Sequence, residues 1–122
     1  MSIKPFSELV AAAKARIREV SVDDVKRRLD AGAGPHLIDV REDGEWARGH
    51  LPGAAHLSRG LLDCNIGNVF ADADAEIVLY CAGGARSALA AVTLADMGYT
   101  RVASMAGGFK AWQDAGYPVG ND

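Results

Sequence analysis

The 122-residue sequence contains only two cysteines, and it lacks any continuous apolar run of about twenty residues. Two cysteines do not make a disulfide scaffold, and such sparse usage fits a reducing compartment. The missing apolar run leaves no candidate transmembrane helix, and residues 1–15 lack the apolar core of a secretory signal. The sequence therefore predicts a cytoplasmic protein that does not act at a membrane.

A large excess of charge of one sign is also missing. Thirteen Lys and Arg against sixteen Asp and Glu give a net charge of −3, and the one basic cluster, at residues 26–28, is typical of a solvated helix face. No nucleic-acid footprint is present. The three histidines lack the close spacing of metal ligands, so we expect neither a metal nor a cofactor. Without repeats or linkers, this length predicts one domain.

The hydrophobic pattern predicts an α/β fold with a mostly parallel sheet of about five strands, at 19–21, 36–40, 55–57, 77–80 and 101–104. Amphipathic patterns predict helices on both faces of this sheet, at 5–18, 21–29, 86–97 and 109–116, with a helical turn at 45–48. Polar residues predict a connection at 67–75. We expect an N-terminal helical extension over residues 1–18, a core over 20–119 and a loose tail from residue 120.

Two helices have predicted inward stripes. In the N-terminal helix the stripe is formed by Phe6, Leu9, Val10, Ala13 and Ile17. In the helix from Arg86 it is formed by Leu89, Val92, Leu94 and Met97. Because the N-terminal stripe is short, we expect that helix to pack back on the domain instead of binding a membrane or a partner.

The joint between the strand at 77–80 and the helix from Arg86 carries the main chemical signal. Cys81 opens it, and four small residues follow: Ala82, Gly83, Gly84 and Ala85. Small residues let the backbone curl and turn its N–H groups inward, and the helix N-terminus adds free amides and a positive dipole end. Such surroundings lower a thiol pKa from about 8.5 to roughly 3.5–7.5. The sequence predicts a thiolate at Cys81, with a contribution from Arg86; a buried structural cysteine is the alternative.

Three stretches, in order, resemble the rhodanese family of sulfurtransferases: LIDVREDGEWARGHLPGA at 37–54, CAGGARS at 81–87 and AGGFKAWQDAGYPV at 106–119. The resemblance implies a single rhodanese-like domain over residues 1–122. It implies that Cys81 takes a sulfane sulfur from a donor such as thiosulfate, holds it as a persulfide, and passes it to cyanide, a thiol or a protein cysteine. We expect a monomer or a weak homodimer. The loop from Ala82 to Ser87 binds the substrate in this interpretation.

Further candidate site residues follow the other predicted strands. Asp39 and Arg41 lie near the carboxyl end of the strand at 36–40, the edge of a parallel sheet where ligands collect. The resemblance implies that they support the active loop, although a local salt bridge explains Arg41 equally well. Arg59 follows the strand at 55–57 and could lie at the pocket rim, where it would attract an anionic donor. An ordinary exposed arginine explains this residue at least as well. Cys64 could resolve a persulfide, but no neighbour indicates its activation.

Loop length separates the enzyme alternatives. Four residues lie between Cys81 and Arg86, whereas cysteine phosphatases and arsenate reductases of related architecture have five. A ring with one amide fewer suits a single sulfur atom better than a tetrahedral phosphate. We therefore predict sulfur transfer. A non-catalytic or sulfur-relay rhodanese module is the alternative, and a cysteine phosphatase or arsenate reductase ranks behind it.

Overall fold

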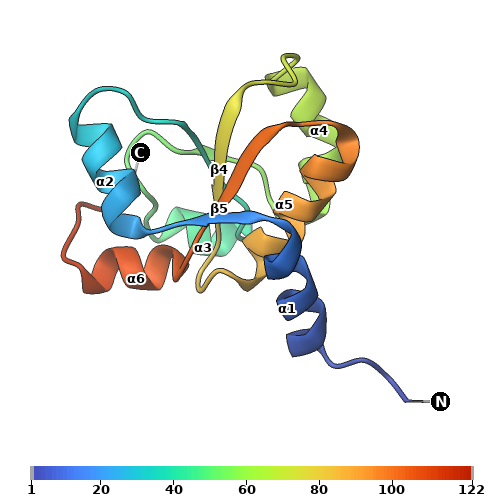
Figure 1. Cartoon of the computed structure of the whole chain (residues 1–122). Helices are drawn as coiled ribbons and strands as arrows, with labels where there is room; N and C mark the ends of the chain where they lie inside the picture. The colour runs from blue at the N-terminus through green and yellow to red at the C-terminus, as the bar shows by residue number, and fades with distance from the viewer. Residues whose placement is uncertain (1, 122) are drawn as a thin grey trace.

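Five parallel strands form one sheet in the order β1-β5-β4-β2-β3 in the computed structural model, which describes residues 2–121 (Figure 1). The predicted α/β class and its parallel sheet are confirmed. The strands are β1 (Arg18–Val20), β2 (His36–Asp39), β3 (Ala55–His56), β4 (Glu76–Tyr80) and β5 (Arg101–Met105). β4 lies at the centre, so the residues that follow it emerge in the middle of the carboxyl edge.

Helices cover both faces of the sheet, as the sequence predicts (Figure 1). They are α1 (Phe6–Arg16), α2 (Val22–Asp30), α3 (Asp43–Ala47), α4 (Arg59–Val69), α5 (Ala85–Met97) and α6 (Gly108–Asp114). α4 and α5 pack on one face, and α2 and α6 pack on the other. Ser21 begins α2 as expected, because its hydroxyl accepts a hydrogen bond of 3.0 Å from the Asp24 amide.

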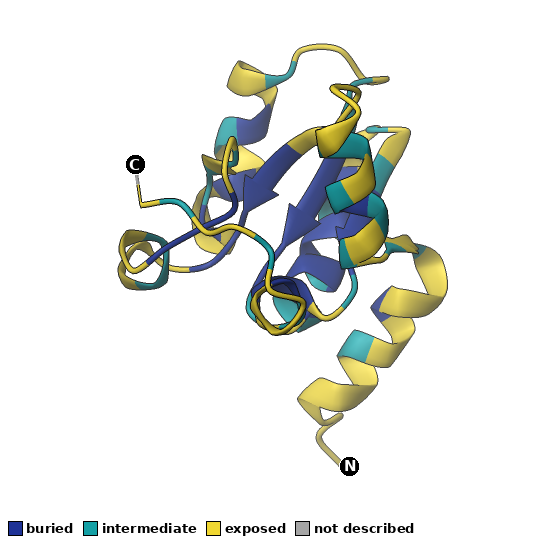
Figure 2. Cartoon of the chain, turned by 90° about the vertical axis from the view of Figure 1, so that its left-hand side faces the viewer, coloured by how far each residue is buried: buried dark blue, intermediate teal, exposed yellow. Residues whose placement is uncertain are grey.

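The alternation of side chains along β4 divides the core into two clusters. Ile77, Leu79 and Cys81 belong to the cluster under α4 and α5, whereas Val78 and Tyr80 belong to the cluster under α2 and α6. Figure 2 shows the strands buried between these layers. The period of two thus directs the Cys81 side chain toward the N-terminus of α5.

α1 packs back on the domain, as predicted, but its inward stripe differs from the prediction. Ala13 is buried, and Arg16 forms an ion pair of 2.7 Å with Asp96 on α5. Phe6 and Leu9 are instead 53% and 47% exposed. The start of α1 extends away from the body of the domain, so its first residues remain exposed (Figure 2).

α4 is a helix that the sequence reading did not predict, and it replaces the first part of the connection expected at 67–75. Glycine and asparagine within it lower its intrinsic helix propensity. Leu62 and Ile66 lie one helical turn apart and are buried against the sheet. Tertiary packing of this apolar face stabilises the helix despite its composition.

α5 presents small residues to the sheet in place of the larger ones that the periodicity favoured. Leu94 is buried as predicted, but Met97 is 48% exposed, and Leu89 and Val92 are only partly buried. The positions packed most deeply include Ala88, Ala90 and Ala91. Alanines allow the helix to lie close to β4, which brings its N-terminus up to Cys81.

The predicted loose tail is also incorrect at Gly120. This residue pairs with His50 through two backbone hydrogen bonds of 2.9 and 2.8 Å. Residue 122, the end of that predicted tail, lies outside the described residues.

Because Gly67 lies inside α4 with open space around its missing Cβ, Gly67→Ala should raise the free energy of unfolding by about 0.5–1 kcal/mol. Gly53→Ala is the matched control, since its surroundings are equally open but its φ of +79° is left-handed. That variant should lose about 1 kcal/mol. Urea unfolding measures both changes, and destabilisation by Gly67→Ala would contradict a helix at this position.

Candidate active site

The Cys81 sulfur points into the loop that joins β4 to α5. Its Sγ accepts hydrogen bonds from the backbone amides of Gly84 and Ser87, at 3.1 and 3.4 Å, and lies 3.5 Å from the Ser87 hydroxyl. Ser87 is in the first turn of α5, so one of its donors is an otherwise unpaired amide of the helix N-terminus. The predicted curled loop with inward amides is present.

These donors change the acidity of the thiol. Burial alone raises the pKa of Cys81, but hydrogen bonds from the Ser87 hydroxyl and from the amides of Ser87, Gly84 and Gly83 outweigh it. The pKa of the thiol consequently lies below its ordinary value. The residue is only 1% exposed. Its sulfur is thus both buried in the core cluster and surrounded by donors that favour the thiolate.

The loop holds this shape because backbone amides of α6 donate hydrogen bonds to carbonyls on its outer side. The amides of Phe109 and Lys110 donate to the carbonyls of Cys81 and Ala82, at 2.8 and 3.0 Å. With those two carbonyls held outward, the following amides turn inward. Gly108 has a φ of +58°, and a Cβ there would collide with the Cys81 carbonyl oxygen, so the close approach of α6 requires glycine. Gly84 turns the chain with a φ of +102°.

Arg86 places its guanidinium against Glu45 on α3. It donates two hydrogen bonds to the Glu45 carboxylate, at 2.8 and 2.9 Å. Together with the Glu42 amide, which donates to Glu45 at 3.0 Å, this pairing lowers the pKa of Glu45 to about 2, against an opposing effect of burial. Arg86 still senses the Cys81 thiolate, but Glu45 is the main influence on its pKa. Donors of the loop backbone and Ser87, more than Arg86, surround the sulfur.

Asp39 and Arg41 form a buried ion pair at the end of β2. Arg41 donates to both Asp39 oxygens at 2.7–3.0 Å and to the Gly49 carbonyl at 2.7 Å. The local salt bridge considered for Arg41 is therefore present, and neither side chain hydrogen bonds to residues 82–87, all of which the structure describes. The Arg41 guanidinium lies 4.2 Å from the centre of the Phe109 ring. It thus contacts the residue whose amide holds the Cys81 carbonyl.

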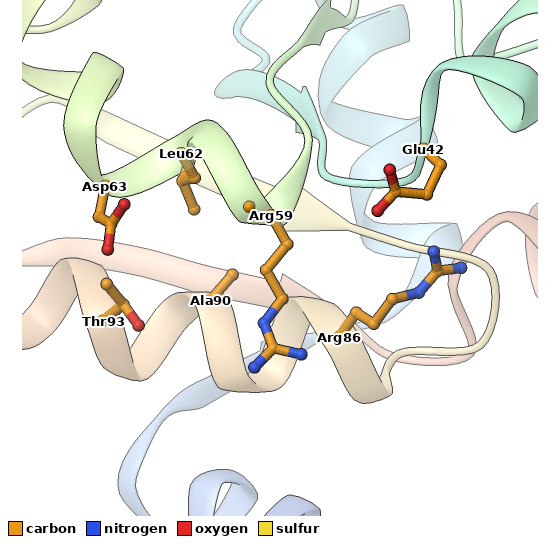
Figure 3. A pocket seen from close by; sticks show the side chains of 8 residues that line it. Glu42, Arg59, Leu62, Asp63, Arg86, Ala90 and Thr93 are labelled. Carbon is orange, nitrogen blue, oxygen red and sulfur yellow. The ribbon is translucent and has the colours of Figure 1, made fainter.

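Arg59 and Arg86 line a cavity of about 460 Å³ between α4 and α5 (Figure 3). Arg59 is the first residue of α4, and its side chain extends across the cavity toward α5 (Figure 3). Within residues 2–121 its guanidinium has no hydrogen-bond or ion-pair partner, so its charge is available to a ligand. Glu42 and Asp63 line the same cavity. Cys81 does not line it; the rim position expected for Arg59 is therefore beside the loop and not directly above the sulfur.

The structure does not bring the two cysteines together. Cys64 is exposed on α4, whereas Cys81 is buried. Cys64 lies 3.4 Å from the Leu61 carbonyl and 3.4 Å from the Asn65 amide, neither of which is charged. Residues 2–121 contain no group of three His, Cys, Asp or Glu side chains arranged to hold a metal ion, and no helix among them has the length and apolar character to cross a membrane.

Two residues of the site were missed by sequence reasoning. Glu45 is 41 positions away from Arg86, and Ser104 reaches Ser87 from β5 at 2.8 Å. Neither contact has a local sequence signal. The paired glycines before α6 do indicate close helix packing in the sequence, but they do not tell that Gly108 meets the loop of Cys81.

The Glu45–Arg86 pair predicts a pH-dependent contribution to stability. Because the folded-state pKa of Glu45 is about 2 and the ordinary value is 4.5, the carboxylate stabilises the fold above pH 4.5 and loses this effect as the pH falls toward 2. Glu45→Gln should cost about 1–2 kcal/mol at pH 7. The difference from wild type should shrink below pH 4.5. A constant difference from pH 7 to pH 2 in urea unfolding would refute this assignment.

Asp96→Asn is the matched control for that comparison. It removes the exposed ion pair with Arg16, whose two side chains are more than half exposed. Exposed pairs contribute little to stability, so this variant should change the free energy of unfolding by less than about 0.5 kcal/mol.

Comparisons with known proteins agree with this geometry. The family model "Rhodanese-like domain" matches residues 21–115. A sulfurtransferase from Allochromatium vinosum is 33% identical over 84% of this chain and 94% of its own length. A thiosulfate sulfurtransferase from Ectopseudomonas mendocina is 36% identical over 66% and 72%, respectively. A solved Rhodopseudomonas palustris protein of unknown function, described as a possible tyrosine phosphatase, is 35% identical, with 98% of both chains covered and a TM-score of 0.90. The chain belongs to the rhodanese-like family of sulfurtransferases.

Proposed function

We propose that this protein transfers a sulfane sulfur through a persulfide on Cys81. One observation carries the proposal: Sγ receives donors from the Gly84 and Ser87 amides and lies beside the Ser87 hydroxyl, in surroundings that lower the thiol pKa. The thiolate, not the thiol, is the nucleophile in such chemistry. Membership of a sulfurtransferase family supports the same assignment.

In the first half-reaction, the Cys81 thiolate attacks the outer sulfur of a donor such as thiosulfate. A new S–S bond forms, the S–S bond of thiosulfate breaks, and sulfite leaves with the bonding electron pair. The negative charge that was on Sγ is then carried by the outer sulfur of the persulfide. The loop from Ala82 to Ser87 provides fixed dipoles for that charge, which need not reorganise during the reaction.

In the second half-reaction, cyanide, a small thiolate or a protein cysteine attacks the outer sulfur. The persulfide S–S bond breaks, and Sγ leaves as a thiolate that returns to its hydrogen bonds with Gly84 and Ser87. Both leaving groups are stable anions, so this chemistry needs no general acid. The absence of a proton-transfer role for Asp39 agrees with its engagement by Arg41.

A sulfur-relay protein is the second candidate, because it shares the first half-reaction and differs only in its acceptor. It would deliver the sulfur to one protein cysteine and react slowly with small acceptors. Phosphate hydrolysis is less consistent with the four-residue spacing between Cys81 and Arg86. It is also less consistent with an Arg86 side chain that is engaged by Glu45.

Cys81→Ser should abolish sulfur loading, because serine at this position cannot form a persulfide. The measurement is intact-protein mass after incubation with thiosulfate: wild type should gain one sulfur and lose it on addition of cyanide. Cys64→Ser is the matched control and should load like wild type, since Cys64 has no activating neighbours. Loading that survives Cys81→Ser but not Cys64→Ser would overturn the proposal.

Sulfur loading, turnover with small acceptors and phosphatase activity together separate the candidate functions. Turnover with cyanide or a small thiol supports the enzyme. Stable loading without such turnover supports the relay protein. Hydrolysis of p-nitrophenyl phosphate that is lost in Cys81→Ser, without any sulfur loading of wild type, would support the phosphatase instead.

Arg59→Ala should raise the KM for thiosulfate about threefold to tenfold and leave kcat nearly unchanged, because this guanidinium, which has no partner among residues 2–121, attracts the dianion without touching the sulfur. Arg27→Ala removes the same charge from exposed residues of α2, on the opposite face of the sheet, and is the control. Steady-state kinetics at low ionic strength measures both. Equal effects of the two variants would show a dependence on net charge alone.

A further inference from the structure

Two buried hydroxyl groups form a chain that ends at the Cys81 sulfur. Ser87 Oγ, on α5, lies 3.5 Å from Sγ and 2.8 Å from Ser104 Oγ, on β5. Both serines are fully buried. Ser104 makes no other side-chain hydrogen bond within residues 2–121, so its hydroxyl is committed to Ser87.

The direction of the hydrogen bonds follows from the charge of the sulfur. A thiolate only accepts hydrogen bonds, and each serine hydroxyl has one hydrogen to donate. When Cys81 is ionised, Ser87 must donate its hydrogen to Sγ, which leaves the Ser87 oxygen as an acceptor. Ser104 then donates to Ser87. Hydrogen bonds arranged in one direction polarise each other, so the second hydroxyl strengthens the donor that reaches the sulfur.

We propose that Ser104 is a positioning residue that acts through Ser87 to stabilise the Cys81 thiolate. Its hydroxyl donates a hydrogen bond to the Ser87 oxygen, which favours the orientation in which the Ser87 hydrogen faces the sulfur. The significance of this role for turnover rests on the proposed function, because the same thiolate is the nucleophile of the first half-reaction and the leaving group of the second.

The other charged groups around the loop do not duplicate this role. Arg86 on α5 is paired with Glu45 on α3, and Asp39 is paired with Arg41 at the end of β2. From β5 and α6, the groups that face the loop are the Ser104 hydroxyl and the backbone amides that hold the Cys81 and Ala82 carbonyls. Removal of the Ser104 hydroxyl leaves all of these pairs in place.

Ser104→Ala is a clean variant because it leaves no buried hydroxyl without a partner. Ser87 retains its contact with Sγ, and the alanine side chain fits a fully buried position that already holds serine. We expect the pKa of Cys81 to rise by about half a unit. This is the change expected when the hydrogen bond from Ser87 to the thiolate remains but loses the strengthening that Ser104 gives it. Thermal unfolding checks that the fold is kept.

The pKa is measured in a Cys64→Ser background, so that Cys81 is the only thiol. Two readouts are used across a pH series: the rate of alkylation by iodoacetamide and the ultraviolet absorbance of the thiolate. The absorbance does not require a reagent to reach the buried sulfur. Thr100→Ala is the control, because it removes an exposed hydroxyl just before the start of β5 and should leave the pKa unchanged.

A double-mutant comparison shows whether Ser104 acts through Ser87. Ser87→Ala should raise the pKa of Cys81 by about one unit or more, since it removes the donor itself. The double variant Ser87→Ala/Ser104→Ala should show no further rise. An unchanged pKa in Ser104→Ala, or a full additional rise in the double variant, would overturn the proposal.

Kinetics provides a readout that a purely structural role would not change. At a pH where both proteins are fully ionised, the more basic thiolate of Ser104→Ala should be loaded by thiosulfate at least as fast as wild type. It should release the sulfur to cyanide about twofold more slowly, because a more basic thiolate is a better nucleophile and a poorer leaving group. Equal slowing of both steps would indicate distortion instead. A pKa shift in a protein that takes up no sulfur would refute the proposed function and leave the role of Ser104 intact.

Discussion

The site depends on the backbone hydrogen bonds that α6 donates to the carbonyls of Cys81 and Ala82. This contact fixes the two peptides that carry the Ala82 and Gly83 amides, and the amides of Gly84 and Ser87, later in the loop, donate to the sulfur. Burial of a thiolate among apolar side chains is costly without such donors. These hydrogen bonds require the backbone of α6 to approach the Cys81 loop closely, which Gly108 permits. α6, which follows β5 in the chain, is thereby joined to the consecutive β4 and α5 around one atom.

Around this atom the charges are arranged in pairs. Arg86 is neutralised by Glu45, and Arg41 is neutralised by Asp39, so the field at the sulfur comes mainly from oriented dipoles of the backbone and of Ser87. Dipoles in a dry environment act at short range and are not screened by salt as exposed charges are. Arg59, the cavity arginine without a partner among the described residues, acts on a different scale: it faces solvent, where it can attract an anion before contact.

The features that could be predicted from the sequence are those formed by residues close together in the chain. The strand, small-residue loop and helix around Cys81 are consecutive, and their change of period and glycines predicted them correctly. α4 was not predicted because its glycines and asparagines have low helix propensity. The helix is stabilised by the packing of Leu62 and Ile66 against the sheet. Phe6 was assigned to an inward stripe, since a helical pattern does not tell where a partner surface ends. The pairing of Arg86 with Glu45 and the contact of Ser87 with Ser104 arise from folding of distant segments.

The almost complete enclosure of Cys81, of which 1% is exposed, also bears on the durability of the protein. An electron-rich sulfur on an open surface is readily oxidised by peroxide, first to sulfenic and then to irreversible sulfinic and sulfonic acids, and accessibility is one of the factors that control this damage. Here the hydrogen-bond donors favour the thiolate, which is the more readily oxidised form, while burial restricts access to it. Burial therefore offsets part of the oxidative risk that comes with a lowered thiol pKa, because any oxidant must reach a sulfur that is almost fully enclosed.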